Sequence, residues 1–178
     1  MAQKIKKWKE LSRELVFQKY GRKIEKVMFE LPGGGQSDFY IKREGPAVCV
    51  FALTKDNHVI LAKQFRPGME EILLEIPGGR AEVGETAEQA AERELLEETG
   101  YKGQVKLFTE AFDCAYSTMR RFCCVATECE KVAQLQNTST EITETVLLSL
   151  DEFRKLLRGG KMTDIEVGYL GLDYLGLL

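Results

Sequence analysis

The chain has 178 residues, of which 44% are hydrophobic and 30% are charged, and its formal net charge is -3. This length fits one globular domain with a buried core, and no apolar run is long enough to span a bilayer. The slight negative charge argues against a protein that coats nucleic acid or lies on a membrane surface. The five cysteines have neither disulfide nor zinc spacing, so we expect buried thiols in a reducing cytoplasm.

Residues 1–45 are predicted to form an N-terminal extension. The pattern predicts a short helix around 7–15, strands near 23–31 and 38–43, and a flexible turn at 32–35 between the two strands. The extension is too rich in aromatic residues for a disordered tail, and two short strands cannot bury such a surface alone. We therefore expect it to need a partner surface, either its own domain or a second subunit.

Residues 46–178 are predicted to form an α+β domain. After a β-hairpin at 47–66, strands are expected at 70–79, 106–112, 120–127 and 145–150. Near the C-terminus, Asp151 is expected to cap an amphipathic helix, and a last helix is expected from Asp164 onward. Mixed strands with a central helix and C-terminal helices are typical of an α+β arrangement.

The central helix has well-marked ends in the sequence GGRAEVGETAEQAAERELLEETGY, residues 78–101. Thr86 and Gln89 have the spacing of a capping box, in which each side chain accepts a hydrogen bond from the other residue's backbone. Gly100 stands where a helix ends in a left-handed residue. The sequence therefore predicts a helix over residues 87–99.

Three glutamates of this helix, Glu94, Glu97 and Glu98, fall within a sector of roughly 100°. Carboxylates this close repel one another, so the cluster needs a compensating cation. Oxygen ligands without histidine or thiolate suit Mg²⁺ or Mn²⁺. The single histidine, His58, lies in a hairpin turn, which argues against a histidine-ligated metal site or a Ser-His-Asp triad. A solvated acidic helix is the alternative interpretation.

A pattern of glycines and charged residues resembles the Nudix box of the Nudix hydrolase family: Gly79, Glu85, Arg93-Glu94, Glu97-Glu98 and Gly100. Residues 64–66 and 74–79 resemble the ADP-ribose pyrophosphatase and nucleoside diphosphate sugar hydrolase branch of that family. Tyr101 departs from the pattern, where the family usually has an aliphatic residue. The resemblance implies a mixed β-sheet sandwiched between α-helices, with an N-terminal β-strand extension. It also implies metal-dependent hydrolysis of the pyrophosphate bond of nucleoside diphosphate sugars to a nucleoside monophosphate and a sugar phosphate.

The resemblance further implies that Mg²⁺, for which Mn²⁺ can substitute, is bound beside the helix. Its implied or candidate ligands are Glu94, Glu98, Glu97, the carbonyl of Gly78, and Glu82, with Glu85 nearby. Arg93 is expected to hold a neighbouring glutamate in position. For the catalytic base that activates water, Glu141 is the first match, Glu144 is the second, and Glu97 within the box is the competing residue.

The expected substrate contacts are Arg66, Glu75, Tyr116 and Trp8. Arg66 resembles the arginine that meets substrate phosphate in this branch, and Glu75 lies in the second matching segment. Tyr116 stands near the position where ADP-ribose hydrolases carry a proline, which leaves other substrates open, GDP-mannose among them. The branch is commonly homodimeric through its N-terminal strands, so a homodimer is expected, with Trp8 as a candidate contact to the base. A nucleoside triphosphate pyrophosphatase and a non-catalytic nucleotide-sugar sensor are the alternative functions.

Overall fold

The computed structural model describes residues 4–135, 137 and 142–178. Their contacts divide the chain into two compact units. The N-terminal unit contains the chain up to Gly45 together with Phe112–Arg120, and the main unit contains Pro46–Ala111 and Arg121–Leu178. The assignment of the loop 112–120 to the N-terminal unit was not predicted.

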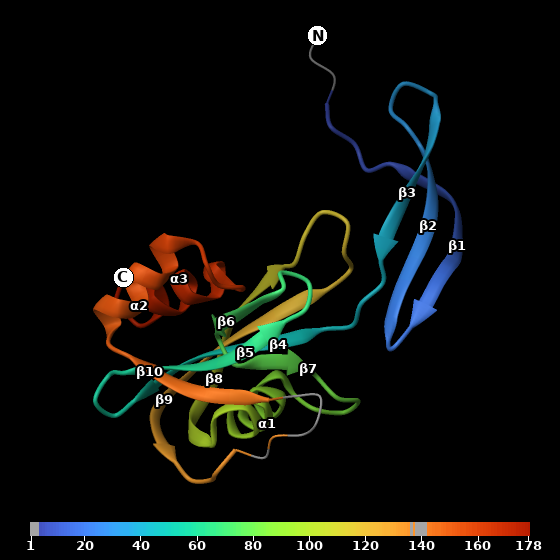
Figure 1. Cartoon of the computed structure of the whole chain (residues 1–178). Coiled ribbons are helices and arrows are strands. Elements are labelled where there is room, and N and C mark those ends of the chain that lie inside the picture. Colours follow the sequence, from blue (N-terminus) through green and yellow to red (C-terminus); the bar gives the residue numbers. More distant parts are fainter. Residues whose placement is uncertain (1–3, 136, 138–141) are drawn as a thin grey trace. The chain divides into compact units, whose positions relative to one another are not determined.

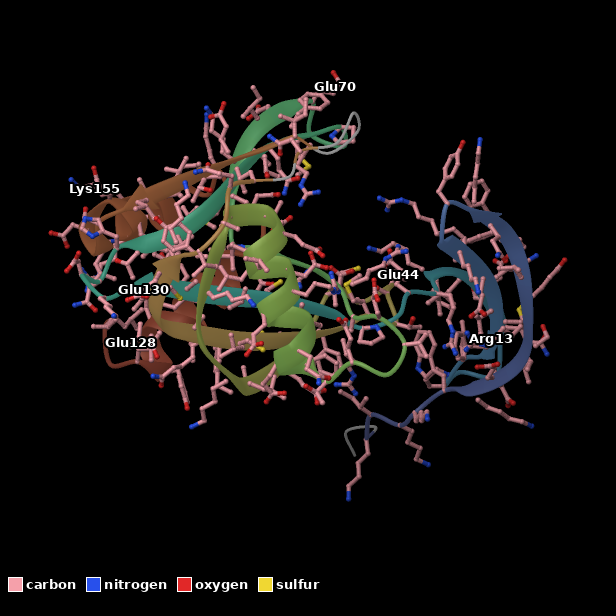
Figure 2. All side chains as sticks on the ribbon, turned by 90° about the horizontal axis from the view of Figure 1, so that it is seen from below. Arg13, Glu44, Glu70, Glu128, Glu130 and Lys155 are labelled. Carbon is pink, nitrogen blue, oxygen red and sulfur yellow. The ribbon has the colours of Figure 1, made fainter. Side chains whose placement is uncertain are left out.

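The N-terminal unit is built on a three-stranded antiparallel sheet (Figure 1). Its strands follow the chain in order: β1 (Lys9–Lys19), β2 (Arg22–Glu30) and β3 (Gln36–Lys42). β2 and β3 correspond to the two predicted strands. Arg13 on β1 bonds to Glu10 and to Glu25 of β2, so a charged network crosses one face of this sheet (Figure 2).

The helix predicted around residues 7–15 is wrong, because this segment forms most of β1. Tyr20 and Gly21 both have positive φ, 50° and 74°, which is the geometry of a tight two-residue hairpin turn. β1 therefore folds back on β2, with Lys19 opposite Arg22 at the turn. Hydrogen bonding to the neighbouring strand outweighs the local helix preference of this segment.

The main unit contains a seven-stranded mixed sheet. Its strands are β4 (Ala47–Thr54), β5 (Val59–Arg66), β6 (Glu71–Glu75), β7 (Gly78–Arg80), β8 (Tyr101–Phe112), β9 (Arg120–Lys131) and β10 (Thr143–Leu148). The central order is β10-β5-β4-β9-β8, with β6 paired to β5 and β7 paired to β4. β4 and β9 are parallel, whereas β5 is antiparallel to β4 and to β10.

Helices cover both faces of this sheet, with α1 (Ala87–Thr99) on one face and α2 (Leu150–Gly159) and α3 (Ile165–Tyr174) on the other (Figure 1). Successive side chains of β4 alternate between two core clusters because strand side chains point alternately to opposite faces. The first cluster joins Val48, Val50 and Ala52 to Ala90, Ala91 and Leu95 of α1. The second joins Cys49, Phe51 and Leu53 to Phe153, Leu157 and Leu172 of the other helices. The predicted sandwich is confirmed.

The ends of α1 are as predicted: Thr86 and Gln89 form the capping box, and Gly100 is left-handed with φ 75°. The predicted start of α2 is wrong. Ser149, two residues before Asp151, is the N-cap and forms its own capping box with Glu152.

Four of the five cysteines are buried as expected, but Cys114 is exposed. No helix among the residues that the structure describes has the length and apolar character needed to cross a membrane.

Candidate active site

Two glycines let the start of the predicted box approach its surroundings closely. Gly78 pairs with Cys49 of β4, and a Cβ added at Gly78 would lie 2.3 Å from the carbonyl oxygen of Val48. A Cβ at Gly79 would lie 2.3 Å from Oε1 of Glu94. Any larger residue would push β7 off β4 or displace the Glu94 carboxylate. The glycines therefore set the distance between β7 and the acidic face of α1.

Glu98 is a partly buried glutamate of that face. Its Oε2 accepts a hydrogen bond from the backbone N–H of Gly78 at 3.0 Å. Burial raises the pKa of Glu98 to about 7; the Gly78 N–H and Arg66 oppose this rise, and the carboxylates of Glu94 and Glu75 add to it. Removal from water and nearby like charges both disfavour the ionised form. A cation bound at this carboxylate would relieve that cost.

Arg93 organises the other acidic side chains of the box. Its Nε and Nη2 donate to the two oxygens of Glu85, at 2.9 and 3.0 Å, in a bidentate pair. Nη1 donates to Glu94 at 2.9 Å and to Glu97 at 3.2 Å, and Nη2 also reaches the carbonyl of Arg80 at 3.0 Å. The planar guanidinium thus fixes the directions of three carboxylates at once.

Glu85 completes this arrangement from the loop before α1. Its Oε2 accepts the backbone N–H of Glu82 at 2.8 Å. The hydrogen bonds from Arg93 and then from Glu82 lower the pKa of Glu85 to about 2, so it stays ionised at neutral pH. Glu82 itself is exposed. Glu85 therefore ties the loop to Arg93.

The three glutamates predicted to share one face of α1 do so, but their carboxylates are not drawn together. Arg93 holds Glu94 and Glu97, whereas Glu98 turns toward Gly78. The side chain of Glu97 is 59% exposed and that of Glu94 is 13% exposed. Within the described parts of the chain, no three acidic, histidine or cysteine side chains form a group that could hold a metal ion.

The residues present nevertheless fit a hard divalent cation by their chemistry. The donors are carboxylates, which Mg²⁺ and Mn²⁺ prefer. Glu98 is enclosed and feels the negative charge of Glu94, a repulsion that a cation would remove. Of the three glutamates on this face, Glu94 and Glu98 are the two that are shielded from water and whose charges repel each other.

A second cluster lies at the ends of β5 and β6, around the carboxylate of Glu75, which is 1% exposed. Its Oε2 accepts from Arg66 Nε at 2.6 Å and from Gln64 Nε2 at 2.9 Å, and its Oε1 accepts from the hydroxyl of Thr163 at 2.7 Å. Gln64 Nε2 also lies 3.5 Å from Oε1 of Glu98. Arg66, Glu75 and Glu98 are thereby brought into one site.

Sequence reasoning missed Gln64 and Thr163. Gln64 is the first residue of the segment 64–66 that carried Arg66. Its place two residues earlier on the same strand puts it on the same face, so period-two spacing could have found it. Thr163 is 88 residues from Glu75 in the chain, and no local signal relates the two.

Of the two candidate bases outside the box, Glu141 and Glu144, the structure describes Glu144. Glu144 of β10 lies opposite Lys63 and forms an ion pair with it at 2.9 Å, with its side chain 68% exposed. Because Lys63 and Gln64 are consecutive in β5, this pair points away from the face that carries Gln64. Glu141 lies outside the described residues.

The other two predicted substrate contacts, Trp8 and Tyr116, belong to the N-terminal unit. Trp8 packs against Phe29 and Phe39, with ring centroids 6.1 and 5.4 Å apart, and is 41% exposed. Tyr116 stacks on Phe39 at 6.4 Å and is 56% exposed. Both rings therefore belong to one aromatic cluster around Phe39, and both keep a free surface.

Hydrogen bonds tie the loop of Tyr116 to the segment after β3. The carbonyl of Tyr116 accepts from the Lys42 N–H at 2.8 Å, and the carboxylate of Glu44 (Figure 2) accepts from the Ser117 hydroxyl at 3.1 Å. The Glu44 N–H donates to Thr118 at 2.9 Å. These bonds explain why the loop packs with the N-terminal unit.

Beside Trp8 the N-terminal unit is hollowed by a pocket of about 580 Å³. It is lined by Trp8, Glu30, Leu31, Pro32, Lys4, Lys6, Lys7 and Lys9. This pocket combines an aromatic ring with four cationic side chains and is of the size that a small organic ligand occupies.

Comparison with known proteins gives three relevant similarities. The family described as NUDIX domain matches residues 43–166. ADP-ribose pyrophosphatase of Bacillus subtilis (strain 168) is 32% identical over 153 residues, which cover 83% of this chain and 81% of that protein. Methanol dehydrogenase activator of Bacillus methanolicus is 38% identical over 94 residues, which cover 53% of this chain and 51% of that protein.

A solved structure titled crystal structure of ADP compounds hydrolase has a TM-score of 0.82 to this chain. The match covers 99% of this chain and 100% of that one, at 21% sequence identity. This similarity shows that the two chains share a fold.

Proposed function

Since the chain belongs to the NUDIX domain family, we propose that it hydrolyses the pyrophosphate bond of nucleoside diphosphate sugars resembling ADP-ribose, with Mg²⁺ as cofactor. The products would be a nucleoside monophosphate and a sugar phosphate. The observation that carries the proposal is the cluster in which Glu75 holds Arg66 beside Glu98. It combines a cation for a diphosphate with carboxylates for a metal ion. The relative named ADP-ribose pyrophosphatase supports the substrate class.

In this proposal Glu94 and Glu98 hold the divalent ion, with Glu97 and the carbonyl of Gly78 as further ligands. A divalent ion bound here neutralises phosphate charge and lowers the pKa of a bound water molecule. Arg93 keeps the Glu94 carboxylate directed, through its hydrogen bond at 2.9 Å. Glu82 is exposed, so it is the least supported of the candidate ligands.

Arg66 is proposed to bind the substrate diphosphate. Its Nε is taken by Glu75, and its side chain is 41% exposed. Among the described residues, none accepts a hydrogen bond from its two terminal nitrogens. Two parallel N–H groups of this kind match a pair of phosphate oxygens. Glu75 thereby serves the substrate site by orienting Arg66.

We propose Glu141 as the base that activates water, with Glu97 as the competing residue. Glu144 is disfavoured because Lys63 holds it at 2.9 Å on the other face of the strand. Each of the three is changed to Gln and kcat is measured. Loss of the base is expected to lower kcat by about a hundredfold or more. A loss below about threefold for Glu141→Gln, beside a collapse for Glu97→Gln, would return the role to the helix.

The base of the substrate is proposed to contact the aromatic cluster of Trp8, Tyr116 and Phe39. An aromatic surface suits a nucleobase, and Trp8 lines a pocket of this unit. Trp8 is the only tryptophan of the chain, so its fluorescence reports this contact directly. ADP-ribose is expected to quench it in the wild type. Full quenching retained in both Tyr116→Ala and Phe39→Ala would contradict a base bound at this cluster.

A homodimer is also proposed, formed through the N-terminal sheet. All eleven residues of β1 are exposed in the single chain, among them Leu15, Val16 and Phe17. A sheet with this much apolar surface is stabilised by a covering partner. Sedimentation of the full chain should give a dimer at micromolar concentration, and removal of residues 1–42 should give a monomer or an insoluble chain. A full-length monomer at that concentration would contradict the proposal.

One screen decides among the functions. The chain is incubated with ADP-ribose, other nucleotide sugars including GDP-mannose, and nucleoside triphosphates, with Mg²⁺ and then with a chelator. Chelator-sensitive release of a nucleoside monophosphate from ADP-ribose is expected. Preference for triphosphates would indicate a triphosphate pyrophosphatase, and binding without turnover would indicate a sensor.

The five free cysteines support a reducing compartment, so we propose the cytoplasm.

A further inference from the structure

The buried carboxylate of Glu75 accepts hydrogen bonds from three side chains. Oε2 receives both Arg66 and Gln64, at 2.6 and 2.9 Å, whereas Oε1 receives the Thr163 hydroxyl at 2.7 Å. In the described part of the chain, Thr163 is the one donor to Oε1. A carboxylate held at both oxygens cannot rotate about its Cγ–Cδ bond without losing a partner. The orientation of Glu75, and with it the position of Arg66 Nε, therefore depends on Thr163.

Thr163 is itself held in place by both of its chain neighbours. Met162 on one side is buried in the core cluster beneath α2 and α3. Asp164 on the other side pairs with Arg121 of β9 at 3.1 Å and has a left-handed backbone, φ 55°. The backbone at Thr163 is therefore held in place on both sides, which fixes the position of its hydroxyl.

The hydroxyl has one proton and two carboxylates within reach, because it also interacts with Asp164. Burial raises the pKa of Asp164, and the guanidinium of Arg121 and, to a smaller extent, the hydroxyl of Thr163 oppose that rise. Asp164 already has the guanidinium of Arg121. Oε1 of Glu75 has the hydroxyl as its described donor, and it lies at 2.7 Å. A buried acceptor without a donor costs more free energy than one that shares a donor, so the hydroxyl of Thr163 donates its hydrogen bond to Glu75.

We propose that Thr163 is a positioning residue for the substrate site, which fixes Glu75 so that Glu75 presents Arg66 to the diphosphate. The inference rests on the proposed function for the role of Arg66, and extends it to the loop between α2 and α3. Gln64 assists on the other oxygen of Glu75 and connects the group to Glu98, from which its amide nitrogen is 3.5 Å distant.

The test compares Thr163→Val, which keeps the shape but removes the donor, with Thr163→Ser, which keeps the donor. Thr163→Val should raise KM for a nucleotide sugar about tenfold, the size of one lost hydrogen bond to a charged group, with kcat changed less than about threefold. Thr163→Ser should stay within about twofold of the wild type. Thr54→Val is the matched control. Among the described residues, the one hydrogen bond of its hydroxyl comes from the turn N–H of His58, at 3.0 Å, and Glu75 takes no part in it.

A double-mutant cycle separates positioning from a general structural effect. In the Arg66→Ala background, Thr163→Val should add less than about twofold to KM, because the group that Thr163 positions is gone. An equal loss in both backgrounds would overturn the proposal. Thermal melting of every variant verifies that the fold is retained.

A second readout does not depend on hydrolysis. The Nε–H resonance of Arg66, identified by its absence in Arg66→Lys, is followed by NMR. It should shift or broaden in Thr163→Val and stay in place in Thr163→Ser and Thr54→Val. An unmoved resonance in Thr163→Val overturns the inference, even if activity falls. A moved resonance in a chain that hydrolyses no nucleotide sugar would support the link from Thr163 to Arg66 and reject the proposed function.

Discussion

Both units of this chain form regular β-sheets, but two of their strands differ in burial: β1 of the N-terminal unit is exposed to solvent and β4 of the main unit lies in the core. All eleven residues of β1 are exposed, whereas six of the eight residues of β4 are buried. The charge of the two parts of the chain also differs. Residues 1–45 contain eleven Lys and Arg against six Asp and Glu, whereas residues 46–178 contain fourteen Lys and Arg against twenty-two Asp and Glu. Strand pairing alone can shape a sheet, but an apolar cover is needed to stabilise it. The main unit supplies that cover with its own helices, whereas the described residues of the N-terminal unit form no helix.

The largest expected effect belongs to the acidic face of the main unit. Glu94→Gln and Glu98→Gln should each lower kcat by about a hundredfold or more at saturating Mg²⁺, because a proposed metal ligand would be lost. Chelation should abolish turnover in the wild type. Glu130→Gln is the control, since Glu130 is 61% exposed and pairs with Lys55. Near-native turnover of either site variant would show that its role is wrongly assigned.

The contrast in burial predicts a contrast in stability. Phe153 is fully buried and stacks on Phe51 at 5.4 Å. Phe153→Ala should lower the free energy of unfolding by about 3–5 kcal/mol at any protein concentration. Phe17 of β1 is 51% exposed. Phe17→Ala should cost less, about 0.5 kcal/mol in dilute protein, and more as concentration rises, because the proposed dimer would cover this side chain. An equal small cost at every concentration would remove β1 from the interface.

Glycines in the two units should also respond differently. Gly79→Ala would place a Cβ 2.3 Å from Oε1 of Glu94, so the carboxylate must move. Activity should fall by about tenfold to a hundredfold, as expected when the proposed metal ligand is displaced by about an ångström. Gly33→Ala in the N-terminal unit meets no atom within 4 Å. It should leave kcat and KM unchanged, and an equal effect of the two substitutions would show that local contact with Glu94 is not the cause.

The smallest effect concerns the thiols. Burial raises the pKa of Cys123 and Cys129 to about 11 and that of Cys124 to about 12. At pH 8 a thiol reagent should modify Cys114 in the folded protein, and all five cysteines after denaturation. The buried thiols should also make the fold less stable as pH rises from about 9 to 11, because the unfolded thiols ionise first. Rapid modification of more than one native thiol would contradict this burial.

Local signals predicted the centre of the main unit well. Thr86, Gln89 and Gly100 mark the ends of α1, and the structure begins and ends the helix as they indicate. The continuous apolar run at residues 47–54 and the turn after it predicted β4 and β5 as a hairpin, because a strand buried on both faces needs such a run. The contact between Arg93 and Glu97 was also accessible, since helix positions four apart are neighbours.

Where prediction failed, distant segments decided the outcome. The segment 7–15 has the local composition of a helix, yet the turn at Tyr20 and Gly21 pairs it with β2. The loop 112–120 lies between two strands of the main sheet in sequence, but bonds to Lys42 and Glu44 place it in the N-terminal unit. Neither preference is visible within a window of a few residues.

The sequence by itself determined the helix of residues 87–99, its acidic face and the family that these residues identify, because caps and spacing act within one or two turns of chain. Only the tertiary structure decided how the carboxylates are used. Arg93 takes Glu94 and Glu97, Glu98 bonds to Gly78, and Thr163 reaches Glu75 from 88 residues away. These choices depend on which buried donors and acceptors the packed sheet and helices bring within about 3 Å of one another, and that distance is set by the whole core.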